Sequence, residues 1–220
     1  MKYFIDTEFI EGFKKPIKWL PTVGNFNKPY HSIQLISIGI VAEDGREYYA
    51  ISNEFNANDA SDWVKENVIS KLPSKHFNGM NTSDVKLWKS NKQIAEDIVN
   101  FCGAVEIPVD ANWSALIKEN GGESVVQRGN PEFYAYYADY DWVLFCSLFG
   151  TMMDLPNGFP MYCNDLKQSL DEKGSYYKKY RQGNPDIESD DRFPKQTNEH
   201  NALDDARWNY KLYKFLKNVL

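Results

Sequence analysis

Two carboxylates near the start of the chain are spaced for joint chemistry. Asp6 and Glu8 lie two positions apart in the apolar run of residues 2–9. Residues i and i+2 of an extended strand point to the same face, so the two side chains would project side by side. Like charges repel strongly at low dielectric, and a bound divalent cation relieves that repulsion. The pair alone also fits a strand end whose carboxylates face water, because charged residues are mostly exposed.

The last helix supplies a third acid. An apolar stripe at helical spacing marks this helix: Trp208, Leu212, Phe215, Leu216 and Val219. Asp205 lies three residues before Trp208 on the same inward stripe, where a carboxylate needs a partner. His200 precedes Asp205 by five residues, which places its imidazole at the start of the helix. Asn201 is the expected N-cap with Asp204 at the third position, which gives Asp204 a structural role.

A fourth acid, Asp141, stands where a strand is expected to turn into a helix. Residues 132–138 are aromatic and β-prone, and the apolar segment 142–149 ends at Gly150. Asp139 is the alternative at this turn, with helix capping as its simpler explanation. The pairing of Asp141 with Tyr140 favours Asp141.

The acids together predict a metal site with a base beside it. Carboxylate oxygens suit Mg²⁺ or Mn²⁺, and two such ions about 3.5–4 Å apart can activate water and stabilise the leaving oxygen of a phosphodiester. A histidine can take the proton of that water, because its unperturbed pKa of about 6.5 is close to working pH. His200 is the candidate base, and the candidate ligands are Asp6, Glu8, Asp141 and Asp205.

These motifs resemble a known family. Residues 6–8 in the first strand, 140–141 before a central helix and 200–205 before the last helix resemble the three motifs of the DEDDh 3′-5′ exonucleases. More narrowly, residues 3–11, 35–50 and 200–207 are similar to the exoribonuclease AS group, small bacterial and phage enzymes that trim RNA from the 3′ end. The resemblance covers most of the chain, and the motif order agrees with the expected strands and helices.

The resemblance implies an α/β ribonuclease H-like fold, with a mixed central sheet flanked by helices. It also implies two Mg²⁺ or Mn²⁺ ions per active site. Asp6, Glu8 and Asp205 would bind one ion, Asp6 would also touch the second, and Asp141 would act mainly through water. His200 would be the general base.

Other implied features concern the substrate. Thr7 and Phe9, beside the motif acids, would contact it. Segments 11–31 and 104–130 depart from the family and are expected to be insertions that reshape the groove.

The charge distribution limits how a nucleic acid can bind. The net charge of −6 does not favour a long polyanion across the surface, so phosphates must be gripped locally. Segment 11–30 is locally basic, and segment 173–183 carries four positive charges and no acid. Tyrosines in that second segment could stack bases while Lys178, Lys179 and Arg181 hold phosphates, although a solvated loop fits equally well.

The elements expected around these motifs are short and alternate in type. A hairpin is predicted from strands 33–42 and 46–52 around the turn at Asp44-Gly45. Helices are predicted from a cap at Asn58 or Asp59 to Leu72, after a cap at Asn91, and over 164–171. Segments 11–30 and 74–90 are expected to be irregular.

Length and composition predict one globular domain over residues 1–220. A hydrophobic content of 42% and a charged content of 25% are ordinary for such a domain. The sequence has neither an apolar run of about 20 residues nor a signal pattern, so we expect a cytoplasmic protein without a membrane segment. Its three cysteines are expected to be reduced thiols, and a homodimer is one assembly that the sequence allows.

The leading hypothesis is a 3′-5′ exoribonuclease acting on single-stranded ends, with RNA favoured over DNA as the partner. A DNA exonuclease would share the same residues and differ in contacts to the 2′-OH. A nucleic-acid-binding module of the same fold would not need the intact set of acids. A ribonuclease H or transposase-like endonuclease would not need the spacing between His200 and Asp205.

Overall fold

The fold is given by a computed structural model. It describes residues 1–14, 20–21, 23, 27–74, 82–103, 130–196 and 198–219. Almost all of the expected insertion 104–130, and part of the expected insertion 11–31, therefore lie outside the described residues. The single-domain reading stays a prediction.

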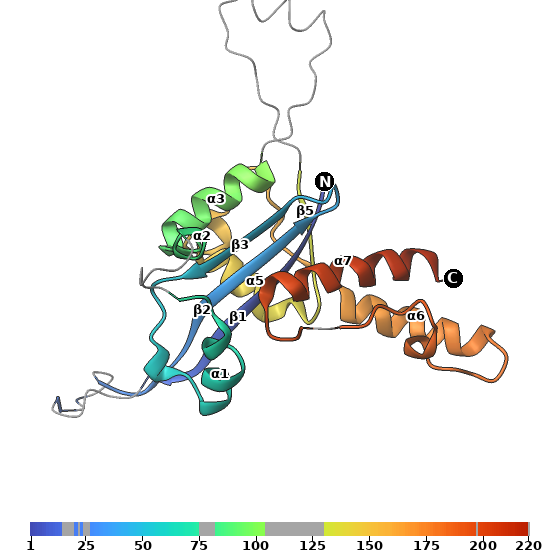
Figure 1. The fold of residues 1–220 in the computed structure, drawn as a ribbon, viewed down its shortest axis with the longest axis horizontal. Helices are drawn as coiled ribbons and strands as arrows, with labels where there is room; N and C mark the ends of the chain where they lie inside the picture. Colours follow the sequence, from blue (N-terminus) through green and yellow to red (C-terminus); the bar gives the residue numbers. More distant parts are fainter. Residues whose placement is uncertain are drawn as a thin grey trace, which may run out of the picture.

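A six-stranded mixed sheet forms the centre of the molecule (Figure 1). The strands are β1 (Lys2–Lys14), β2 (Tyr30–Ala42), β3 (Glu47–Ser52), β4 (Trp88–Lys89), β5 (Glu132–Ala135) and β6 (Asn164–Asp165), in the order β4-β3-β2-β1-β5-β6. Strand β2 is antiparallel to both β1 and β3, whereas β1 with β5, β3 with β4 and β5 with β6 are parallel.

Helices cover both faces of this sheet. The α-helices are α1 (Asp62–Asn67), α2 (Thr82–Val85), α3 (Asn91–Gly103), α5 (Ala138–Ser147), α6 (Leu166–Tyr180) and α7 (Ala202–Asn218). Short 3₁₀ turns are η1 (Ala57–Asp59), η2 (Ile69–Lys71), η3 (Met152–Asp154) and η4 (Ile187–Ser189). The expectation of a mixed α/β sheet flanked by helices is confirmed.

Alternation along the strands divides the core between the two faces. Tyr3 and Ile5 of β1 pack with buried residues of α3 and α5. Phe4 points the other way and packs with buried residues of α6 and α7. Further along β1, Ile10 packs with Val68 beside α1 and η2. In Figure 1, α7 crosses the strands and α6 runs beside it, away from the sheet.

Several predicted element boundaries were wrong. The loop expected from residue 11 begins later, because residues 11–14 pair with residues 30–33 as a two-stranded extension of β1 and β2. The helix expected to end near residue 171 continues to Tyr180, so segment 173–183 is largely helical. The predicted strand 132–138 ends at Ala135.

Helix caps and one edge strand also differ from the prediction. Ser61, and not Asn58 or Asp59, caps α1, because its side chain accepts a hydrogen bond from the Val64 N–H. Ser90 exchanges hydrogen bonds with Gln93 at the start of α3, where Asn91 was expected to cap. Segment 74–90, expected to be irregular, contains α2 and the edge strand β4.

Among the described residues, none of the helices is both long and apolar enough to cross a bilayer. The cytoplasmic location and the homodimer stay predictions.

Candidate active site

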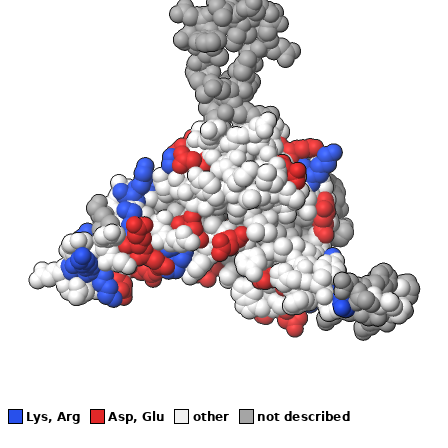
Figure 2. Space-filling model, turned by 180° about the vertical axis from the view of Figure 1, so that it is seen from behind, with Lys and Arg blue, Asp and Glu red and all other residues white. Residues whose placement is uncertain are grey.

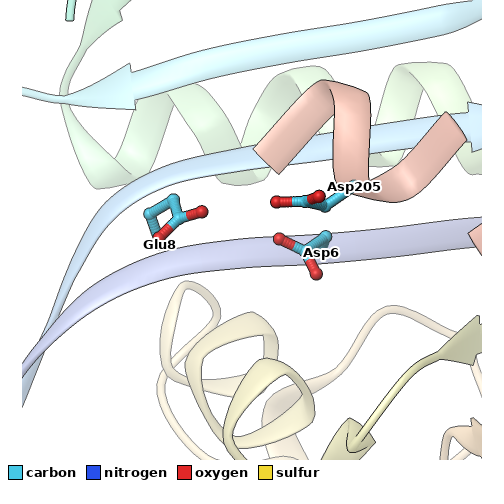
Figure 3. Close-up of side chains that lie close together, drawn as sticks. All are labelled: Asp6, Glu8 and Asp205. Atoms are coloured by element: carbon cyan, nitrogen blue, oxygen red, sulfur yellow. The ribbon is translucent and has the colours of Figure 1, made fainter. Parts of the chain in front are cut away.

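Three of the predicted carboxylates meet at one point. Asp6 and Glu8 project from β1, and Asp205 reaches them from the first turn of α7 (Figure 3). One ligand oxygen from each of the three lies within 4.8 Å of the other two. Asp205 is buried, while Asp6 and Glu8 are half-buried. A divalent cation prefers oxygen ligands grouped in this way.

The alternation of β1 explains why this point stays polar. Phe4, Asp6, Glu8 and Ile10 share one face of the strand. Phe4 is covered by α7, and Ile10 is covered by the segment of α1 and η2. The two carboxylates therefore lie in the gap between two packed layers, where β1 offers oxygens in place of apolar side chains.

The close approach of α7 to the sheet carries Asp205 into that gap. A Cβ atom at Gly39 would lie 2.5 Å from the Cα atom of Leu203 and closer still to the carbonyl group of Ala202. Gly39 pairs with Asp6 across the β1–β2 ladder. Asn209, one turn beyond Asp205, is buried and donates a 2.9 Å hydrogen bond to the carbonyl oxygen of Ile5. These contacts fix the register between α7 and β1.

Local hydrogen bonds orient the Asp205 carboxylate. The side-chain amide of Gln196 donates to its Oδ1 atom, and the backbone N–H of His200 donates to its Oδ2 atom at 3.0 Å. Asn201 caps α7 as predicted, because its side chain accepts from the backbone N–H groups of Leu203 and Asp204. The chain just before α7 is thus folded back onto the helix start.

His200 stands beside the carboxylates in an unusual backbone conformation. Its φ of 68° lies in the left-handed region, which residues other than glycine rarely adopt. The imidazole packs at right angles to the indole ring of Trp63 on α1, with ring centroids 4.8 Å apart. The predicted base therefore lies between the start of α7 and α1.

Asp141 approaches the site from the opposite face and the open edge of β1. Strand β5 pairs with β1 only as far as Phe4. Beyond that point, the Oδ1 atom of Asp141 accepts hydrogen bonds from the Thr7 N–H at 2.9 Å and from the Thr7 hydroxyl at 2.6 Å. Asp141 is buried, whereas Asp139 is exposed. Tyr137 is the N-cap residue of α5 and makes no side-chain cap bond, so Asp139, inside the first turn, is not the cap.

Burial raises the pKa of all four acids, and repulsion from neighbouring acids adds to the effect for Asp6, Glu8 and Asp141. Burial raises the pKa of Glu8 to about 8, with the charges of Asp205 and Asp141 adding to the effect and Lys71 opposing it. Burial also raises the pKa of Asp141 to about 7, against the hydrogen bonds from Thr7. The pKa of Asp6 is raised by burial and then by its three acidic neighbours, and the pKa of Asp205 is raised by burial. A bound cation would relieve this repulsion and stabilise the ionised form of the four acids.

The predicted substrate contacts lie in two places. Thr7 bonds to Asp141, and the ring of Phe9 stacks on Tyr140 with centroids 5.4 Å apart. Lys178, Lys179 and Arg181 lie instead at the end of α6. There Lys178 pairs with Asp186, while Lys179 and Arg181 lie over the rings of Tyr180 and Tyr177. Their role in substrate binding stays a prediction.

Sequence reasoning missed four residues that build the site: Gly39, Trp63, Gln196 and Asn209. A glycine inside an otherwise apolar strand signals close approach of another backbone, so Gly39 could have been found. Asn209 lies four residues after Asp205 and three before Leu212 on the inward stripe, and a buried amide there needs a partner. Trp63 carries no such local signal, because its partner His200 comes from a distant part of the chain. Gln196 lies only nine residues before Asp205, but it stands in an irregular segment without periodicity.

Two comparisons with known proteins cover most of the chain. The model of the 3′-5′ exoribonuclease Rv2179c-like domain family matches residues 23–216. The chain belongs to this family. It is 34% identical over 174 residues to the 3′-5′ exoribonuclease Rv2179c of Mycobacterium tuberculosis strain ATCC 25618 / H37Rv. The aligned part makes up 79% of this chain and 76% of that relative, and the 3′-5′ exoribonuclease MT2234.1 of strain CDC 1551 / Oshkosh aligns equally well.

The family match covers part of the carboxylate cluster. Asp141, His200 and Asp205 lie inside the matched range 23–216, whereas Asp6 and Glu8 precede that range. The structure joins the two parts, because the first turn of α7 brings Asp205 of the family region against the β1 acids (Figure 3).

Proposed function

We propose that this chain is a metal-dependent 3′-5′ exoribonuclease that shortens single-stranded RNA from its 3′ end. The observation that carries the proposal is the convergence of Asp6, Glu8 and Asp205 in a chain of an exoribonuclease family. We assign it to the DEDDh group with a ribonuclease H-like fold. The mixed sheet, with its acids on the central strand β1 and on the last helix, supports that assignment.

The donor set fits two Mg²⁺ or Mn²⁺ ions. Every candidate ligand is a carboxylate, which is the ligand type that these hard cations take. Asp6, Glu8 and Asp205 would hold one ion, Asp6 would share the second, and Asp141 would hold it mainly through water. When bound, two such ions lower the pKa of a water molecule and stabilise both the attacking and the leaving oxygen of a phosphodiester.

The protein's own groups then orient the reactants. His200 accepts the proton of the attacking water at a ring nitrogen, which requires its neutral imidazole. Hydrogen bonds from Thr7 leave Asp141 one oxygen, Oδ2, for other partners. The stacked rings of Phe9 and Tyr140, each next to a site acid in sequence, offer an apolar surface for a base at the 3′ end.

The substrate must be held by local contacts. On the face seen in Figure 2, Asp and Glu lie both across the middle and at the edges, whereas Lys and Arg lie mainly toward the edges of the described residues. A polar groove of about 790 Å³ lies further along β1 than Glu8, between the end of that strand and the segment of η1 and α1. Phe13 and Lys14 line it from β1, and Lys65 lines it from α1. Three acids, Glu11, Asp59 and Asp62, line it as well, so a phosphate there would have to contact the lysines directly. We assign this groove to the RNA strand that precedes the terminal nucleotides.

Linear and circular RNA of one sequence provide the test. An enzyme that needs a 3′ end degrades the linear strand and leaves the circle intact for the same time in Mg²⁺. Degradation of both at similar rates would identify an endonuclease and overturn the proposal. The Asp205→Asn variant should be inactive on the linear strand, which shows that the activity comes from this site.

A further inference from the structure

Trp63 is an exposed tryptophan whose position the core does not explain. Its side chain lies on α1 and is 54% exposed. The apolar residues that anchor this part of the chain are its neighbours Val64 and Val68, which pack with Ile10. Trp63 instead sets its indole ring against the imidazole of His200, with centroids 4.8 Å apart and ring planes at 83°.

His200 has a fixed backbone and a ring with few restraints. Its N–H bonds to Asp205, and its left-handed φ places it just before the helix. Within the described parts of the chain, no hydrogen bond to the imidazole ring is found, and its aromatic contact is with Trp63. The orientation of the ring therefore depends on the indole.

The element that carries Trp63 is tied to the strand that carries the acids. Ser61 caps α1 through the Val64 N–H at 3.2 Å. Val68 and Val64 pack against Ile10, which lies two residues beyond Glu8 on the same face of β1. The indole is thus placed relative to β1, while the backbone of His200 is placed by α7. The contact between the two rings therefore connects α1, which packs on β1, with the start of α7.

We propose that Trp63 is a positioning residue that holds the His200 imidazole in the orientation needed to accept the proton. This inference rests on the proposed function and adds a residue to it. A perpendicular arrangement sets the positive edge of one ring against the negative face of the other, which favours one side-chain rotamer of a partly exposed ring. A misplacement of about 1 Å at a reacting group can cost about 10²-fold in rate.

The first part of the test separates orientation from substrate binding. Trp63→Ala should lower kcat by about 10- to 100-fold, with KM changed by less than about twofold. Trp63→Phe keeps a ring and should recover most of the loss. Glu66→Ala, an exposed position on the same helix, is the matched control and should leave kcat unchanged. A rise in KM with kcat intact would identify Trp63 as a substrate contact and overturn the proposal.

A double-mutant cycle completes the test. If Trp63 acts through His200, Trp63→Ala should cause no further loss in the His200→Ala background. Independent, additive losses would overturn the proposal. In the folded protein, Trp63→Ala should also shift the NMR signals of the His200 ring protons, whereas Glu66→Ala should not. An inactive wild-type enzyme would refute the proposed function, whereas an active one with an inactive His200→Ala and a fully active Trp63→Ala would refute this inference alone.

Discussion

Gly39 has no side chain, and this allows the backbone of Ala202 to lie directly against strand β2. A Cβ atom at Gly39 would overlap the Ala202 carbonyl group and lie 2.5 Å from the Leu203 Cα atom. Because both obstacles are backbone, no side-chain rotation can relieve the clash. The start of α7, and Asp205 with it, must therefore move if any side chain is added here.

Gly39→Ala should accordingly abolish most activity, with a loss of more than about 10²-fold in kcat. It should also lower the free energy of unfolding by about 1–3 kcal/mol, the usual cost of overpacking a core. Gly12→Ala is the control, because an added Cβ there meets nothing within 4 Å. RNA hydrolysis and chemical denaturation of both variants check this, and a fully active Gly39→Ala would contradict the assigned role.

Activity should require a divalent cation and Asp6. Burial raises the pKa of Asp6, and the charges of Asp141, Asp205 and Glu8 raise it further. We expect Asp6→Asn to be nearly inactive at any Mg²⁺ or Mn²⁺ concentration, because the native Asp6 carboxylate would contact both ions. Asp139→Asn, at an exposed position in the first turn of α5, should behave as wild type. Wild-type activity that survives excess chelator would contradict this prediction.

His200→Ala should lower kcat by about 10²- to 10⁴-fold, the usual effect of losing a general base. Metal affinity should stay nearly unchanged, because the acids keep their positions. Calorimetric titration with Mn²⁺ and a pH–rate profile check both statements. A variant that cuts RNA at the wild-type rate with the wild-type pH profile would show that His200 is not the base.

Stability without metal should fall as pH rises from about 5 to about 8. The pKa of Glu8 is raised to about 8 and that of Asp141 to about 7, so the folded protein binds more protons than the unfolded chain in this window. Stability then decreases with pH until both groups are ionised. Acids whose pKa is lowered in the folded protein, such as Asp44 and Glu47, change the pH dependence of stability only below about pH 5.

Added Mg²⁺ should reverse that trend, because it binds the ionised carboxylates of the folded state. The thermal unfolding midpoint should therefore rise more on adding Mg²⁺ at pH 8 than at pH 5. Glu8→Gln should reduce both the pH dependence and the effect of Mg²⁺. An unfolding midpoint that rises with pH in chelator, or that ignores Mg²⁺, would argue against a buried acidic metal site.

The basic end of α6 provides a separate test of substrate binding. Replacing Lys178, Lys179 and Arg181 by neutral residues should raise KM and flatten its salt dependence, if these residues contact phosphates. Thermal unfolding must be followed in parallel, because Arg181 packs on Tyr177 and Lys178 pairs with Asp186. An unchanged KM and salt dependence would show that these three residues do not contact the substrate.

The parts of the site that follow from local periodicity could be predicted from the sequence. The period of two in β1 puts Asp6 and Glu8 on one face, and the helical stripe of α7 turns Asp205 inward. The hairpin of β2 and β3 and the cap at Asn201 also follow from neighbouring residues. Each of these features depends on a few consecutive positions.

The remaining features depend on contacts between distant segments. Helix α6 continues through Gly174, because Leu170 and Tyr177 face the core and Ile187 packs over the glycine. The extension of β1 to Lys14 depends on pairing with residues 30–33. Gly39 under Ala202 and Trp63 against His200 likewise join residues that a local pattern cannot connect.

The central claim is that this site removes nucleotides from the 3′ end of RNA, and a product ladder tests it most directly. Single strands of RNA and DNA with one sequence, labelled at the 5′ end, are incubated with the protein and Mg²⁺. The account predicts a ladder of progressively shorter labelled RNA, slower shortening of DNA, and no ladder with Asp205→Asn. Release of the labelled terminal nucleotide as the first product, or an identical ladder from Asp205→Asn, would contradict it.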